Sequence, residues 1–221
     1  MHGCILRVFS VTQFFCLAIG CAAMLLQASG AAEAISPAVD AEPADVRMVA
    51  QAAVGTRDNQ GLPFAIVDKK RARVFIYGAR GALQGVSPVL LGLARGDDSV
   101  PGIGERKMSE IRPEERITPA GRFNSEPGVN LQGEDIVWLD YDAAVSMHRV
   151  RTNNKKERRL ERLASARPED HRISYGCVNV PAGFYDAHVK PLFGNAPGVI
   201  YVLPENKSAR EYFKFMPDAG R

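Results

Sequence analysis

The stretch "FAIVDKKRARVFIYG", residues 64–78, constrains the fold of this chain more than any other feature. Two short runs rich in β-branched and aromatic residues flank the basic segment "DKKR", and this pattern is typical of a β-hairpin. Four later runs are also strand-like: "VSPVLLGLARG" at 86–96, "DIVWLDY" at 135–141, "AVSMHRV" at 144–150 and "GVIYVLPE" at 198–205. We therefore predict a mostly β domain built from these segments.

The helices that the sequence predicts are few and short. In "NNKKERRLERLASARPED", residues 153–170, Leu160 and Leu163 lie three positions apart among strong helix formers. The run "GFYDAHVKPLFG", residues 183–194, predicts a second helix, whereas the polar residues 97–119, interrupted by Gly and Pro, predict a long loop. The expected fold is mostly β, with a few short helices packed at its edge.

Residues 1–30 are predicted to be a secretory signal peptide. The basic Arg7 precedes an apolar run from Val8 to Leu26, and small residues follow, with cleavage expected near Gly30 or Ala34. Two alternatives remain open: an uncleaved membrane anchor, since the apolar run is nearly long enough to span a bilayer, or a lipoprotein with lipid on Cys21.

The remaining chain is predicted to hold one folded domain. The full sequence of 221 residues, 46% of them hydrophobic, suits a single core with a short appendage. Residues 31–61, which begin rich in Ala, Pro, Asp and Glu, are expected to be a linker in which 44–53 can form a helix. The folded domain is expected at 62–205 and a C-terminal tail at 206–221.

Signal cleavage would leave only one cysteine in the chain. Cys4, Cys16 and Cys21 all lie in the predicted signal, so Cys177 would have no partner for an internal disulfide. It is then either a buried inert thiol or a reactive one. The formal net charge of +3 is too small to indicate a nucleic-acid-binding protein.

The surroundings of Cys177, "HRISYGCVNVP" at 171–181, favour a nucleophile. A catalytic thiol needs a base, and His148 ends a predicted strand, where a side chain can be held at the edge of a cleft. Gly176 lets the backbone approach a substrate closely, so the amides of Gly176 and Cys177 are candidate donors to an oxyanion. Taken separately, Cys177 and His148 could each be structural.

Two segments resemble the L,D-transpeptidases of the YkuD type. "ISYGCVNVP", residues 173–181, resembles the family's Ser/Thr-His-Gly-Cys-hydrophobic-Asn/Arg signature, and His148 stands where its upstream histidine is expected. "ITPAGRF", residues 117–123, resembles the Thr-Pro-x-Gly-x-Phe element that precedes it. The resemblance covers roughly residues 63–203 and implies a β-sandwich-like catalytic domain at 62–205.

The resemblance also implies an activity and its residues. Cys177 would attack an L–D amide of a peptidoglycan stem peptide, His148 would move the proton, and the acyl group would pass from a thioester to an amine. Ser174, Tyr175 and Gly176 would support the oxyanion and the loop. Asn179 and Arg149 would contact substrate, although Asn179 could instead fix the loop.

The implied protein is an exported monomer of the periplasm or cell envelope. We expect no cofactor, no metal, no nucleic-acid partner and no stable membrane insertion after signal cleavage. Two alternatives to the transferase remain open: a catalytically impaired peptidoglycan-binding module of the same fold, and an L,D-carboxypeptidase-type hydrolase.

The chain departs from the family pattern in three places. Tyr175 stands where histidine is usual, Arg149 stands where glycine is common, and the 25 residues at 149–173 exceed the usual spacing. His171 is either a loop residue or a replacement for the missing histidine, and His188 is expected to be structural. Residues 149–172 hold nine Lys or Arg against four Asp or Glu, and we expect 151–170 to form an exposed helix and loop beside the cleft.

Overall fold

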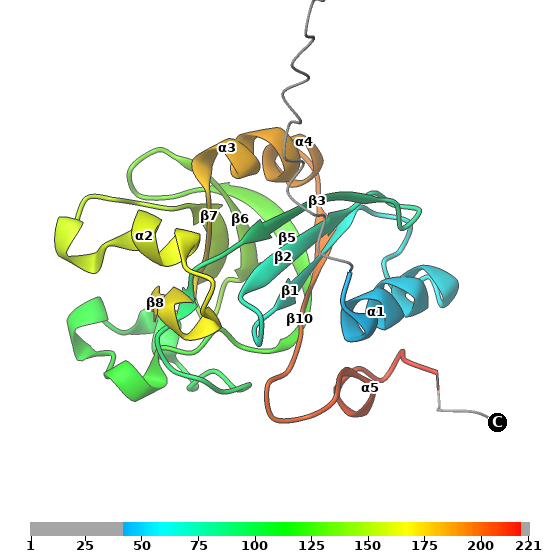
Figure 1. Ribbon diagram of the computed structural model, residues 1–221, viewed down its shortest axis with the longest axis horizontal. Helices are drawn as coiled ribbons and strands as arrows, with labels where there is room; N and C mark the ends of the chain where they lie inside the picture. Colours follow the sequence, from blue (N-terminus) through cyan, green and yellow to red (C-terminus); the bar gives the residue numbers. More distant parts are fainter. Residues whose placement is uncertain (1–41, 218–221) are drawn as a thin grey trace, which may run out of the picture. The chain divides into compact units, whose positions relative to one another are not determined.

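The computed structural model describes residues 42–217 (Figure 1). The predicted signal peptide, with Cys4, Cys16 and Cys21, lies outside these residues, as do the last four positions. Within residues 42–217, none of the helices combines the length and the apolar character that crossing a bilayer requires.

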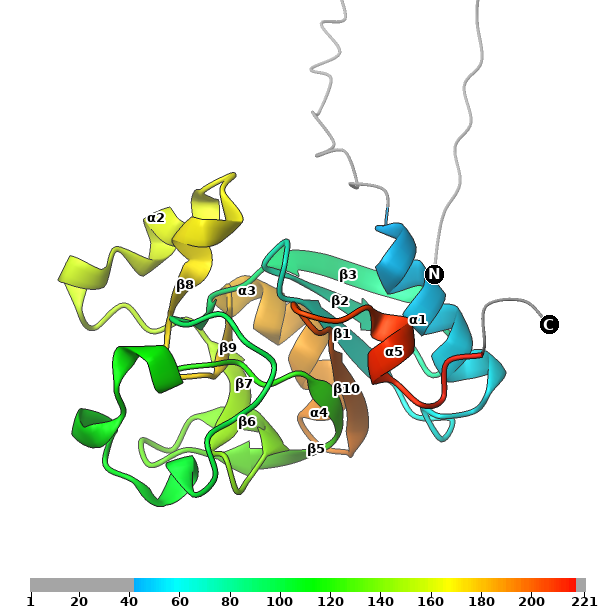
Figure 2. The same cartoon turned by 90° about the horizontal axis from the view of Figure 1, so that it is seen from below.

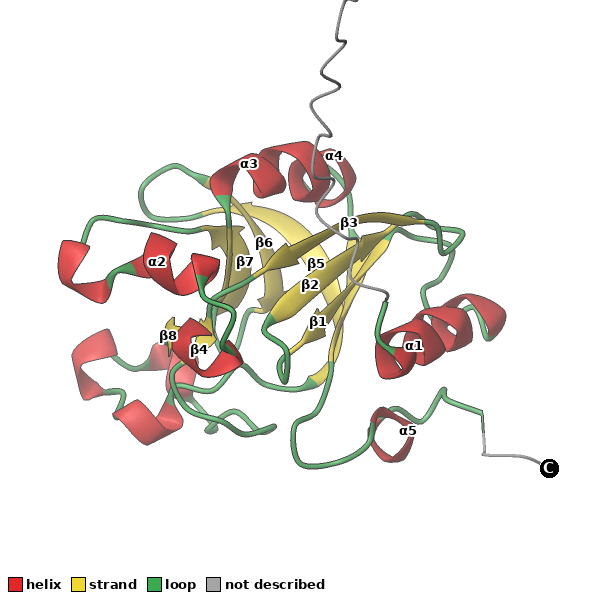
Figure 3. Ribbon diagram, in the orientation of Figure 1, coloured by secondary structure: helices red, strands yellow, loops and turns green. Residues whose placement is uncertain are grey.

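The secondary structure consists of ten strands and several short helical segments across the described residues (Figure 3). The strands are β1 (Phe64–Asp68), β2 (Arg73–Tyr77), β3 (Leu83–Pro88), β4 (Leu91–Gly92), β5 (Gly121–Val129), β6 (Asp135–Asp140), β7 (Val145–Arg149), β8 (Arg172–Ser174), β9 (Val178–Val180) and β10 (Gly198–Val202). The α-helices are α1 (Ala44–Gly55), α2 (Arg159–Ala164), α3 (Ala182–Phe184), α4 (Lys190–Phe193) and α5 (Ala209–Tyr212). Between them lie the 3₁₀ turns η1 (Ile103–Glu105), η2 (Met108–Glu110), η3 (Pro113–Glu115), η4 (Lys155–Glu157) and η5 (Pro168–His171), and the π-helical turn η6 (Tyr185–Val189).

Eight strands form one mixed sheet in the order β3-β2-β1-β10-β5-β6-β7-β9. Strand β5 joins its two halves, because its first residues pair with β10 and its last residues pair with β6. Side chains of β1, β2 and β10 share one buried cluster with those of β6, β7 and β9, so the halves pack face to face. The prediction of a mostly β, sandwich-like fold with a few short helices is confirmed.

The predicted hairpin is present as β1 and β2, paired from Phe64 opposite Tyr77 to Asp68 opposite Arg73. Both faces of β1 are buried: Ala65 and Val67 enter the cluster between the sheet halves, while Phe64 and Ile66 enter a second cluster on the outer face. A strand buried on both faces has a continuous apolar sequence, as in "FAIV" at residues 64–67.

The helix predicted at 44–53 is present as α1, but it is packed against the sheet and is not part of a free linker. Val46, Val49 and Ala53 have no exposed surface and belong to the outer cluster with Phe64 and Tyr201. The spacing of three and four between these α1 residues places them on one face of the helix. Figure 2 shows α1 beside α5. The folded unit therefore includes at least residues 44–55, which the expected linker of residues 31–61 contained.

The predicted C-terminal tail is also partly folded. Helix α5 follows β10 after a short loop, and Ala209, Phe213 and Met216 are buried in the same outer cluster as α1. The folded domain therefore extends beyond its predicted end at residue 205, because these apolar side chains pack on the outer face of β1, β2 and β10.

Other local predictions hold in part. The helix predicted at 183–194 is present as α3, η6 and α4, whose Tyr185, Val189 and Phe193 enter the cluster between the sheet halves. The strand predicted at 86–96 is split, because β3 ends at Pro88 and the short β4 pairs with β8 in a separate two-stranded sheet.

Candidate active site

The strand period brings the predicted site residues onto one face of the sheet. Strands β7 and β9 are parallel neighbours, and His148 lies opposite Asn179. Alternate residues such as Met147 and Val178 enter the core, so Ser146, His148 and Asn179 share the other face. Cys177 directly precedes β9.

His148 is held in one orientation by the backbone. Its Nδ1 atom lies 2.7 Å from the carbonyl oxygen of Arg149, which can only accept a hydrogen bond. Nδ1 therefore carries the proton in the neutral ring, and Nε2 is the free base. Nε2 lies 3.3 Å from Nδ2 of Asn179, and the same amide nitrogen lies 3.3 Å from the Cys177 carbonyl oxygen.

The Cys177 thiol has a lowered pKa. Burial raises its pKa, but the hydrogen bond and charge of His148, together with hydrogen bonds from Ser146, outweigh burial and hold that pKa below its ordinary value. The Ser146 hydroxyl lies 3.6 Å from Sγ. Sequence reasoning missed Ser146, although its position two residues before His148 on a strand places it on the same face.

Ser174 organises the backbone of the loop that carries Cys177. Its hydroxyl donates to the carbonyl oxygen of Cys177 at 2.7 Å and accepts the Gly176 amide at 3.1 Å. The amide of Gly176 is thus already occupied, which corrects its expected role as an oxyanion donor. The amide of Cys177 remains the candidate for that role.

Gly176 is required by the shape of this loop. Its φ of +134° is disfavoured for other residues, and a Cβ atom would lie 2.8 Å from the carbonyl oxygen of Ile117. The buried Thr118 hydroxyl donates to the Gly176 carbonyl at 2.8 Å and accepts the Gly92 amide at 2.8 Å. Sequence analysis noted the element "ITPAGRF" but not this role of its threonine.

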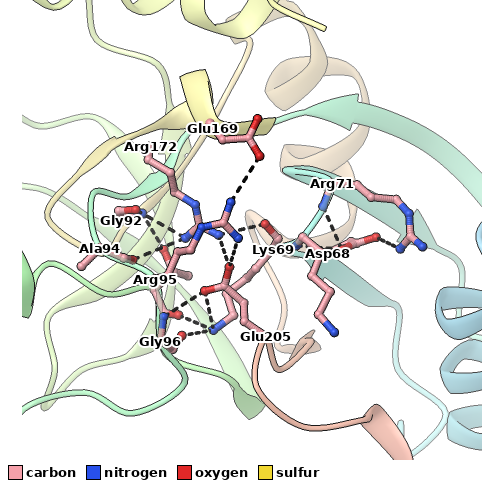
Figure 4. Close-up of polar contacts among 12 residues, drawn as sticks. Asp68, Lys69, Arg71, Gly92, Ala94, Arg95, Gly96, Glu169, Arg172 and Glu205 are labelled. Carbon is pink, nitrogen blue, oxygen red and sulfur yellow. Dashed lines mark hydrogen bonds and ion pairs between the residues drawn. The ribbon is translucent and has the colours of Figure 1, made fainter. Parts of the chain in front are cut away.

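A buried ionic cluster fixes the segments behind the loop (Figure 4). The Lys69 ammonium, which has no exposed surface, donates to Asp97 at 2.9 Å and to the Thr118 carbonyl at 3.0 Å. Burial lowers the pKa of Lys69, and the hydrogen bond from Lys69 to Asp97 opposes that shift. Arg172, at the start of β8, donates to Glu205 at 2.5 Å. The cluster therefore ties β8 and the Thr118 segment to the scaffold.

Tyr175 and Asn179 both line the cleft. The guanidinium of Arg116 lies 4.0 Å above the centre of the Tyr175 ring. Asn179 is almost fully buried, and its amide nitrogen faces His148 Nε2 and the Cys177 carbonyl, each at 3.3 Å. Of the two roles left open for Asn179, these contacts favour fixing the loop.

Arg149 and His171 do not join Cys177. The guanidinium of Arg149 pairs with Asp135 and Asp186, which raise its pKa. Arg149 does not line the cavity beside Cys177, so the expected contact of Arg149 with substrate was wrong. The buried His171 ring lies 2.9 Å from the Val89 carbonyl oxygen and 3.0 Å from that of Ser165. His171 therefore supports the basic segment 149–172, called the insert below. It does not replace the histidine that the family pattern has at position 175.

A cavity of about 250 Å³ opens beside the thiol. Its wall consists of Met108, His148, Arg151, Asn153, Asn154, Glu157, Arg159, Ser174, Tyr175, Cys177 and Asn179. Several of these belong to the insert, which lies beside the cleft as expected; Leu160 is 60% exposed and Leu163 is 7% exposed. Among residues 42–217, no group of three or more His, Cys, Asp or Glu side chains is arranged to hold a metal ion.

No protein-family model and no curated protein sequence matches the chain. Solved structures that match include an L,D-transpeptidase from Mycobacterium smegmatis, with 15% identity and a TM-score of 0.35 over 63% of this chain and 58% of that one. An Enterococcus faecium L,D-transpeptidase mutant matches with 14% identity and a TM-score of 0.31 over 64% and 49%. The helical cell shape determining protein Pgp2 from Campylobacter jejuni matches with 12% identity and a TM-score of 0.41 over 66% and 49%. The chain thus spans about half the length of these proteins, two of which are L,D-transpeptidases, the family that its motifs resemble.

Proposed function

We propose that this chain is an exported cysteine acyltransferase of the L,D-transpeptidase type, acting on peptidoglycan stem peptides in the periplasm or cell envelope. The observation that carries the proposal is that Cys177 and His148 line one open cavity and share Asn179, whose amide nitrogen lies 3.3 Å from both His148 Nε2 and the Cys177 carbonyl oxygen. The lowered pKa of the Cys177 thiol, to which His148 contributes, agrees with this arrangement. The motifs around Thr118 and Cys177 supply the substrate class by resemblance.

The first half-reaction forms a thioester. Nε2 of His148 takes the thiol proton, and the Cys177 sulfur attacks the carbonyl carbon of an L–D amide. The electron pair of the carbonyl moves to oxygen, where the Cys177 amide can donate a hydrogen bond. When the oxyanion collapses, the C–N bond breaks, and the departing amine takes the proton from His148.

The second half-reaction transfers the acyl group. An acceptor amine attacks the thioester carbonyl and gives a proton to His148, and the C–S bond breaks. The product is a new amide, and the Cys177 thiolate is regenerated and recovers its proton from His148. Water in place of the amine would give a carboxylate, which is the hydrolase alternative.

The contacts at Cys177 favour an enzyme over a catalytically impaired binding module. Tyr175 is the main support for the impaired module, yet its ring stacks on Arg116, and His148 still lowers the pKa of the Cys177 thiol. A module that only binds peptides has no need for a thiol whose pKa is lowered by an oriented imidazole.

Incubation of the chain with muropeptides, followed by mass analysis of the products, tests the proposal. Transfer predicts crosslinked or exchanged peptides that require an amine acceptor, whereas hydrolysis predicts only shortened peptides. The Cys177→Ala variant is the control and should form neither. Unchanged muropeptides with the wild-type chain would contradict the proposal.

A further inference from the structure

Most basic residues of the insert are committed to contacts away from the cavity. Of the nine Lys or Arg at 149–172, Arg149, Arg158, Arg167 and Arg172 form ion pairs with acids that do not line it. Arg162 donates to the carbonyl oxygens of Glu157 and Asp170. Only Arg151 and Arg159 line the cavity beside Cys177.

Arg159 is fixed in the cavity wall beside Asn179. Its Nη1 donates to Oδ1 of Asn179 at 2.5 Å, and its Nε donates to Glu157 at 2.5 Å. The side chain is only 14% exposed, so its orientation is set before a ligand arrives. Since a guanidinium has five N–H donors, these two contacts leave donors free for a ligand.

Arg151 reaches the same cavity from the segment that follows β7. Its Nη2 pairs with Glu134 at 2.5 Å, and its Nε is buried without a hydrogen-bond partner among the described residues. The Nη donors of Arg151 that Glu134 does not occupy remain available to an anionic ligand in the cavity. The acid in the cavity wall, Glu157, is already neutralised by Arg159.

We propose that Arg151 and Arg159 bind a carboxylate of the acyl donor next to the scissile amide and make the site selective for anionic peptides. The planar guanidinium matches a carboxylate with two parallel hydrogen bonds. The inference rests on the proposed function and adds to it a specificity determinant that only this insert supplies.

Two synthetic donor peptides test the inference; they differ only in whether the carboxylate nearest the scissile amide is free or amidated. The wild-type chain should acylate with the free carboxylate on the order of tenfold to a hundredfold faster, the range of a charge-assisted hydrogen bond. Arg151→Gln and Arg159→Gln should each slow the carboxylate peptide, through a raised KM, more than they slow the amidated peptide, so that the preference for the free carboxylate falls toward one.

Lys156→Gln is the matched control, because it removes one exposed positive charge from the same insert outside the cavity wall. It should retain the preference for the free carboxylate. Arg151→Gln carries the test alone if Arg159→Gln lowers the melting temperature, since Arg159 also holds Asn179.

Equal rates with the two peptides, or a preference that persists in both arginine variants, would overturn the inference while leaving the proposed function intact. Failure of the proposed function itself would be seen as a lack of acylation by either peptide. If neither peptide acylates Cys177 although neutral iodoacetamide alkylates it, the acyltransferase is wrong and the inference falls with it.

Discussion

The two halves of the sheet differ in how many of their faces are buried. In the half that contains β1, β2 and β10, one face enters the core between the halves and the other is covered by α1 and the segment around α5. In the half that contains β7 and β9, one face enters the same core while the other forms part of the cavity wall. The first half is a scaffold, and the second carries the candidate chemistry.

The comparison teaches how rigid support and an open site coexist in one sheet. The scaffold half contains the buried ammonium of Lys69, which donates hydrogen bonds to Asp97 and to backbone carbonyl oxygens. One of those carbonyls belongs to Thr118, whose hydroxyl holds Gly176. Substitutions in the scaffold should therefore change stability, whereas substitutions on the open face should change reactivity.

The largest effect is expected in the scaffold. Lys69→Met leaves Asp97 buried without its cation and should lower the free energy of unfolding by about 3–5 kcal/mol in urea denaturation. Lys70→Met, at the exposed neighbouring position, should stay within about 0.5 kcal/mol. A loss of less than about 1 kcal/mol for Lys69→Met would show that the cluster does not hold the scaffold together.

The pH dependence of stability should follow the same cluster. Burial raises the pKa of Asp97, but hydrogen bonds from the amides of Glu205 and Asn206 and from Lys69 outweigh burial and lower it below its ordinary value. A lowered folded-state pKa stabilises the fold above the ordinary carboxyl range, and this contribution is lost as the pH falls through the lowered value. Asp97→Asn should flatten the acid limb of the unfolding curve.

On the open face, the expected loss is in reactivity. His148→Ala removes the base and should slow acylation of Cys177 by a donor peptide by ~10²-fold or more. Because the hydrogen bond and charge of His148 lower the thiol pKa, the midpoint of iodoacetamide alkylation against pH should move upward in this variant.

The matched substitution His171→Ala sharpens the comparison. It removes a buried ring that contacts Val89 and Ser165, so it should lower the melting temperature and leave the alkylation midpoint in place. If His171→Ala slowed acylation as much as His148→Ala, the assignment of a single base would be wrong.

The smallest effect is expected at Tyr175. If this position shapes the cleft mainly through its backbone and its stacking on Arg116, Tyr175→His should leave acylation within about tenfold of wild type, well below the loss expected for a positioned base. Steady-state rates with one donor peptide measure this, and Tyr175→Phe is the control that keeps the ring. A hundredfold gain in Tyr175→His would indicate that the native residue impairs the site.

Local patterns predicted the hairpin, and they singled out Cys177 and His148 as the candidate pair, which line one cavity. The hairpin follows from two apolar runs around a polar turn, and the candidate pair follows from a motif that resembles that of a known family. Ser146 was equally accessible to the strand period. These features depend on short stretches of sequence, which is why they can be predicted.

Features that depend on distant contacts were missed. Strand β5 contains Gly, Asn and Pro, which favour turns, and it is a strand because β10 and β6 pair with it. Arg149 forms ion pairs with Asp135 and Asp186, and the Gly176 amide donates its hydrogen bond to the Ser174 hydroxyl. The packing of α1 likewise depends on a sheet face formed by strands far along the chain.

The most direct test of the central claim is the intact mass of the chain after brief incubation with a donor peptide and an acid quench. The account predicts an added acyl mass located on the peptide that contains Cys177, absent in Cys177→Ala and released when an amine acceptor is supplied. A chain that gains no mass while its Cys177 is alkylated by iodoacetamide, or that gains the mass at another residue, would contradict it.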